Sequence, residues 1–119
     1  MNFIFHELNG QKIAELPPGD TMISGVQDAI DLLGNADYMG ASSIIIYKED
    51  LADNFFDLSS GVAGDILQKF SNYRKRLAII GDFERIESKS LRDFIRESNT
   101  TGHILFVPTI NEAMVRFSH

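Results

Sequence analysis

Acidic, hydroxyl and cationic residues follow the short apolar runs of this sequence and precede its predicted helices. These positions matter because ligands of open α/β sheets bind outside the carboxyl ends of the strands, and because free N–H groups at helix N-termini attract anions. The primary candidates for ligand binding or for a switch are Asp57, Ser59, Ser60, Asp82, Lys89 and Ser90. The secondary candidates, which would add polar contacts at the same edge, are Asn72, Arg74 and Arg92.

Each candidate also has a purely structural interpretation. Asp57 and the two serines that follow it are residue types that cap helices. Asp82 follows a glycine and is suited to closing a turn. Lys89 and Arg92 fit the solvated face of a helix, which is normally charged.

The common catalytic and nucleotide-binding motifs are absent. There are no cysteines, which excludes disulfides, thiolate chemistry and cysteine-based zinc sites. His6, His103 and His119 are not spaced as metal ligands, so no metal site is expected. The adjacent Glu49 and Asp50 are expected to face solvent, without a histidine or nucleophile to work with. No GxGxxG, P-loop or GxSxG motif occurs, so we expect no cofactor and favour a binding role over an enzymatic one.

The composition indicates one globular domain over residues 1–119, because 44% of the residues are hydrophobic and 24% are charged. The net charge of −6 disfavours nucleic acid as a partner. No signal peptide and no membrane span is evident, so we expect a cytoplasmic protein that does not bind membranes. The local basic group Lys69, Arg74, Lys75 and Arg76 is interpreted as a solvated helix end.

The start of the chain predicts a β-hairpin. Residues 3–8 alternate, so Phe3 and Phe5 point to one face while Ile4 and His6 point to the other. Asn9-Gly10 is the strongest short hairpin signal, and residues 12–16 form the returning strand before two prolines end it.

Four segments share the apolar spacing i, i+3, i+4, i+7 and are predicted helices with one buried face. Their stripes are Val26, Ala29, Ile30 and Leu33; Ala63, Ile66, Leu67 and Phe70; Leu91, Phe94, Ile95 and Ser98; and Ile110, Ala113, Met114 and Phe117. Capping boxes are predicted at Ser24 with Gln27, Ser90 with Asp93, and Thr109 with Glu112.

Three unbroken apolar runs, at residues 44–47, 77–80 and 104–107, predict parallel strands covered on both faces by crossover helices. The element order is β-β-α-β-α-β-α-β-α. We therefore predict an α/β fold whose mixed, mostly parallel five-stranded sheet starts with an antiparallel hairpin.

Four runs, at residues 55–58, 64–74, 81–83 and 88–94, resemble a small bacterial family known as domain of unknown function 4180. The resemblance extends over essentially the whole chain. It implies a stand-alone bacterial protein and carries no activity with it.

The element order is also similar to that of the STAS domain of anti-sigma-factor antagonists. In that family a D-S-S-G or D-S-T-G turn opens the second helix, and a partner kinase phosphorylates one hydroxyl. Asp57-Leu58-Ser59-Ser60-Gly61 resembles this turn with Leu58 inserted. The resemblance implies that Ser59 or Ser60 is the phosphoacceptor, and charge added at a helix N-terminus would alter docking.

The leading hypothesis is a non-enzymatic regulatory or protein-interaction module with a STAS-like fold. The alternative is a small-molecule binder or enzyme that takes an anionic ligand at the carboxyl edge of the strands. A homodimer is a third interpretation. Phe55 and Phe56 either fold onto the core or form an exposed apolar contact.

Overall fold

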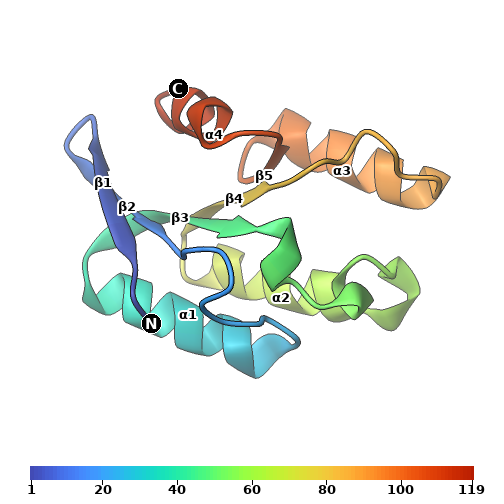
Figure 1. Cartoon of the computed structure of the whole chain (residues 1–119), viewed down its shortest axis with the longest axis horizontal. Coiled ribbons are helices and arrows are strands. Elements are labelled where there is room, and N and C mark those ends of the chain that lie inside the picture. Colours follow the sequence, from blue (N-terminus) through green and yellow to red (C-terminus); the bar gives the residue numbers. More distant parts are fainter.

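The computed structural model describes all 119 residues and confirms the predicted α/β fold with five strands and four helices (Figure 1). The strands are β1 (Ile4–Leu8), β2 (Gln11–Glu15), β3 (Ala41–Tyr47), β4 (Arg76–Ile80) and β5 (Ile104–Val107). The helices are α1 (Val26–Tyr38), α2 (Val62–Asn72), α3 (Lys89–Thr101) and α4 (Ile110–Phe117). Three short 3-10 turns, η1 (Lys48–Asp50), η2 (Asp53–Phe55) and η3 (Leu58–Ser60), fill the long connection before α2.

The predicted hairpin is confirmed. Asn9 and Gly10 have φ values of 53° and 78°, and Leu8 pairs with Gln11 on either side of them. Positive φ at both central residues gives the turn the twist that an antiparallel pair requires. The register places Ile4 opposite Glu15 and therefore fixes which side chains of the two strands share a face.

The sheet has the strand order β1-β2-β3-β4-β5, with β1 antiparallel and the other strands parallel. Because the strand order always advances in one direction, right-handed crossovers place α1, α2 and α3 on one face. Their buried residues form one cluster with alternate residues of the strands. In Figure 1, α1 and α2 lie on one side of the strands and α4 lies on the other.

The prediction that crossover helices cover both faces is therefore wrong. The second face is covered by α4 alone, which packs against β4 and β5 through a smaller cluster around Ala113. Since α4 follows the last strand and crosses to no further one, it is free to take that face. The three apolar runs are nevertheless buried, as predicted, except for Tyr47, which is half-buried.

The helix stripes are largely confirmed, although α1 buries Leu32 and Ala36 where Val26 and Ile30 were predicted. Of the predicted caps, only Thr109 accepts a hydrogen bond from the N–H of its partner, Glu112. The other two predictions are wrong.

The α1 helix begins with Gly25 as its N-cap, and Asp28 reaches back to accept the N–H and hydroxyl of Ser24. The α3 helix is capped by Ser88 rather than Ser90. Asp93 instead pairs with Lys89 and Arg96, so it is not free to act in a capping box.

The connection before α2 packs inward. Phe55 is 1% exposed and Phe56 stacks edge-on against it, so the interpretation that both fold onto the core is confirmed. Asp50 was predicted to face solvent but is only 2% exposed. Every helix is too short or too polar to cross a bilayer.

Candidate functional site

The turn before α2 holds three of the predicted site residues in contact with one another. Asp57 caps η3 because its Oδ1 accepts the N–H of Ser59 at 3.1 Å and the Ser59 hydroxyl at 2.6 Å. The Ser60 hydroxyl donates to the carbonyls of Asn54 and Asp57 and accepts the N–H of Val62. Gly61 has a φ of 78°, a left-handed conformation in which a glycine avoids strain. All three side chains lie on the surface.

Lys48 crosses the carboxyl edge of the sheet from β3 to the end of β4. Its ammonium group donates to the Asp82 carbonyl at 2.9 Å and lies 5.8 Å and 5.2 Å from the ring centres of Phe56 and Phe83. Gly81 makes this approach feasible, because a Cβ at position 81 would lie 2.6 Å from the Cβ of Lys48. The Asp82 carboxylate accepts the N–H of Glu84 and so closes the turn after β4.

A hollow of about 760 Å³ lies beside Lys48 at the carboxyl ends of β3 and β4. Its walls are mostly apolar and include Met22, Phe56 and Ile80. Met22 is 56% exposed. We call this hollow the carboxyl-edge hollow.

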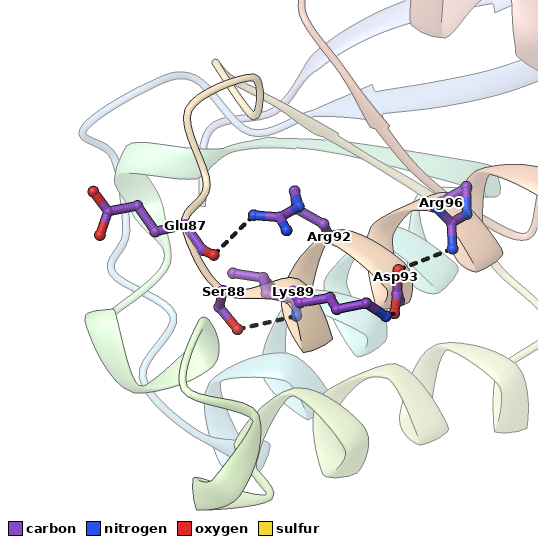
Figure 2. A network of polar contacts seen from close by, with 7 residues as sticks. Glu87, Ser88, Lys89, Arg92, Asp93 and Arg96 are labelled. Carbon is purple, nitrogen blue, oxygen red and sulfur yellow. Dashed lines mark hydrogen bonds and ion pairs between the residues drawn. The ribbon is translucent and has the colours of Figure 1, made fainter.

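The start of α3 places the other predicted residues along one helix. Lys89 pairs with Asp93 at 2.8 Å and remains 81% exposed. One guanidinium nitrogen of Arg92 donates to the carbonyls of Ile86 and Glu87, both at 2.8 Å. Figure 2 shows Ser88 capping the helix while the Arg92 side chain turns toward the main chain at Glu87. Ser90 is exposed on the first turn.

The structure therefore separates the primary candidates into three groups, and their functional role stays a prediction. Asp57, Ser59 and Ser60 lie in one turn, Asp82 accepts a hydrogen bond from Lys48 through its main-chain carbonyl, and Lys89 and Ser90 lie on α3. None of the principal hollows is lined by residues from all three groups.

Two of the secondary candidates lie at the opposite end of β4 from the primary candidate Asp82, and the third, Arg92, lies on α3. Asn72, which accepts a hydrogen bond from Gln68, and the exposed Arg74 precede that strand, whereas Asp82 follows it. A strand of this length separates its ends by roughly 17 Å. Asn72 and Arg74 therefore do not share an edge of the sheet with Asp82. Of the three secondary candidates, only Arg92 remains near the carboxyl edge, where the site was predicted.

A polar cluster that sequence reasoning missed lies on the sheet face opposite α1 to α3. Both carboxylate oxygens of Glu15 are occupied, one by the Tyr47 hydroxyl at 2.7 Å and the other by Nε2 of His6 at 2.8 Å. Burial, followed by the hydrogen bond and charge of Glu15, raises the pKa of Tyr47 to about 12. The hairpin register was the available signal, because it brings His6 and Glu15 to the same face.

The comparison with protein families decides the identity of the chain. The family model described as Domain of unknown function (DUF4180) matches residues 8–117. The chain belongs to this family. No curated protein and no solved structure matches the chain.

The matched span places the candidate residues within the DUF4180 domain. It contains the turn before α2, the carboxyl-edge hollow and the whole of α3. It also contains Glu15 and Tyr47, whereas His6 precedes the first matched residue, Leu8.

Proposed function

We propose that this chain is a non-enzymatic regulatory module that binds a protein partner and is switched by phosphorylation in the turn before α2. The observation that carries the proposal is the exposed Ser59 hydroxyl, held 2.6 Å from Oδ1 of Asp57. This hydrogen bond orients a nucleophilic oxygen on a surface turn, where the active site of a kinase can reach it. The similarity of the turn and of the element order to STAS domains supports the same role.

The geometry favours Ser59 over Ser60 as the phosphoacceptor. The Ser60 oxygen is committed to two carbonyls and to the first N–H of α2. Modifying Ser60 would break the junction between η3 and α2. Ser59 has only the carboxylate of Asp57 as a side-chain partner, so its oxygen can be modified without that loss.

A phosphoryl group on Ser59 would change the turn through charge. It adds about −1.5 to −2 charges at neutral pH, directly beside the Asp57 carboxylate. Like-charge repulsion would remove Asp57 from its position as the cap of η3, while the N-terminus of α2 would attract the phosphoryl oxygens. Phe56 precedes Asp57 and lines the carboxyl-edge hollow, so the rearrangement would reach that hollow. We therefore place partner binding at the hollow.

The test compares the phosphorylation and partner binding of the full chain isolated from its own host. Intact-mass and peptide spectra should show one added phosphoryl group on Ser59, which Ser59→Ala abolishes. Ser59→Asp should change the amount of co-purified partner at least about threefold relative to the unmodified chain, because it adds charge at the switch. Ser71→Asp adds the same charge at the other end of α2, where the side chain is exposed, and should leave partner recovery unchanged.

Two results would overturn the proposal. One is the absence of phosphate on Ser59 in every growth phase sampled. The other is an equal effect of Ser59→Asp and Ser71→Asp on partner recovery, which would show that the added charge acts independently of its place.

A further inference from the structure

Two neighbouring hollows on the outer side of α3 carry an excess of positive charge. One is lined by Arg92, Arg96 and Arg116, and the other by Arg76, His103, Arg116 and His119. They share Thr100 and Arg116, so they form one continuous feature, which we call the basic groove. No aspartate or glutamate lines these two hollows, although the chain as a whole has a net charge of −6. Asp82 and Glu84 line a further hollow that adjoins the first one at Phe83 and Asn99, so the basic groove ends there.

Three of the four arginines are held by main-chain carbonyls rather than by carboxylates. Arg92 donates to the carbonyls before α3, and Arg116 donates to the carbonyl of Asn99. Arg76 donates to the carbonyls of Gly102, Arg116 and Phe117. These bonds fix the guanidinium groups in place without cancelling their charge. A guanidinium group that is already held in place loses less conformational entropy on binding an anion than a freely moving one.

The remaining arginine is only loosely neutralised. Arg96 contacts Asp93 at 2.9 Å, but its side chain is 73% exposed and Asp93 also pairs with Lys89. Exposed pairs of this kind contribute little to stability because water and salt screen them. A stronger anionic partner can therefore compete for Arg96.

Cationic residues at the start of α3 are not explained by helix stability. Arg92 and Lys89 lie in the first turn, which contains no acidic residue. The helix dipole disfavours cations at that end. Arg76 and Arg116 lie instead near the carbonyl ends of α3 and α4, where a cation is favourable. The positive charge at Arg92 therefore indicates a ligand more strongly than the charge at the other end of the basic groove, whereas Arg96 lies in the middle of α3, where the dipole makes no such distinction.

The inner end of the basic groove contains an unsatisfied nitrogen. Nε2 of His103 is buried and has no hydrogen-bond partner. Burial and the charge of Arg76 lower the pKa of His103, while burial and the charge of Arg116 lower the pKa of Arg76. The lowered pKa keeps the His103 ring uncharged at neutral pH, whereas the guanidinium groups of Arg76 and Arg116 lie close enough to repel one another, and an anion beside them would relieve that repulsion.

We propose that the basic groove binds an acidic, extended segment of a protein partner through its aspartate or glutamate carboxylates. The groove runs along α3 as two shallow hollows, a form that suits an extended chain better than a compact small molecule. Arginine forks match carboxylates in geometry. A long nucleic acid would leave the groove and meet the acidic remainder of the molecule, whereas a short acidic segment would not. The inference rests on the proposed function only in requiring a protein partner, and it gives that partner a second contact surface that shares no residue with the carboxyl-edge hollow.

The test measures fluorescence anisotropy of a labelled oligoglutamate titrated with the full chain at low salt. The double variant Arg92→Gln/Arg96→Gln should weaken binding about fivefold or more, since it removes two exposed charge contacts. The control variant Lys69→Gln/Arg74→Gln makes the same change in net charge at the α2–β4 connection, and binding should stay within about twofold of the unmodified chain. Arg92, Arg96 and Arg74 are exposed and Lys69 is half-buried, so circular dichroism verifies that each variant is folded.

Three outcomes would overturn this inference. They are no binding of oligoglutamate, equal weakening by the two double variants, and tighter Arg92- and Arg96-dependent binding of a single-stranded oligonucleotide of matched charge. The assay needs no phosphoryl group on Ser59. A failed groove and a failed switch are therefore distinguishable.

Discussion

At the scale of single residues, Glu15 and Tyr47 illustrate how a buried polar pair depends on pH. Glu15 is 7% exposed, and Tyr47 supplies the donor to one of its oxygens. Because burial and Glu15 raise the pKa of Tyr47 from 10.0 to about 12, the folded chain keeps this proton over a range in which the unfolded chain loses it. The free energy of unfolding should therefore fall as pH rises from 10 through 12.

The substitution Tyr47→Phe should remove that pH dependence. Below pH 10 the variant should be less stable by about 1–2 kcal/mol, because one oxygen of a buried carboxylate loses its donor. The difference from the unmodified chain should shrink above pH 10. Denaturant unfolding on both sides of pH 10 measures the stability, and tyrosinate absorbance should lose the component with a midpoint near 12.

The matched control is Tyr38→Phe, because Tyr38 is 89% exposed. A stability loss of equal size in the two variants at neutral pH would contradict the importance of the Glu15 contact.

Sequence reasoning at this scale succeeded where the contacts are local and failed where they are distant. The Asp57 and Ser59 contact spans two residues and follows from residue type. Asp50, by contrast, is buried because the turn at Gly19, far away in the sequence, donates its N–H to the carboxylate at 2.8 Å. Arg76 was interpreted as solvated, yet it binds carbonyls at the ends of α3 and α4. The spacing of residue types along the sequence cannot predict contacts between such distant residues.

At the scale of elements, the two serines at the start of α3 have different roles, although only one residue separates them. Ser88 accepts the N–H of Leu91 at 3.2 Å, whereas Ser90 is exposed within the first turn. Ser88→Ala should lower the free energy of unfolding by about 1 kcal/mol, because a backbone donor loses its cap. Ser90→Ala should change it by less than about 0.5 kcal/mol. Denaturant melts of the two variants would reverse this order if Ser90 were the cap.

The presence of each helix and strand was predictable because the spacing of apolar residues reflects which face is buried. The exact start of a helix, by contrast, depends on competition between nearby side chains. At α3, Asp93 has two cationic neighbours that draw it away from the helix start. At α1, Asp28 takes the role that the pattern assigned to Ser24 and Gln27. Such choices differ by about 1 kcal/mol, which is below what residue types can resolve.

At the scale of the whole molecule, the sheet is covered unevenly, and the sequence could not reveal this. The spacing showed that each helix has a face to bury, but not the strand order that decides which face it meets. With the order β2-β3-β4-β5, the three crossover helices must share one face. The predicted site residues do not all lie together for a simpler reason, because Asn72 and Arg74 precede β4 whereas Asp82 follows it at the other end of the strand.

Because the sheet is covered unevenly, α4 is the only helix that packs on the second face, over β4 and β5. Ala113 is fully buried there against the cluster that includes Ile80, Leu105 and Val107. Ala113→Asp should cost at least about 3 kcal/mol, because an unpaired charge would either be buried or force α4 off the sheet. For a domain of this size that loss lowers the melting temperature by roughly 10 °C or more. Asn111→Asp adds the same charge to the exposed side of α4 and should shift the melting temperature by no more than about 2 °C. Calorimetric melts that gave both variants the same temperature would mean that α4 does not seal this face.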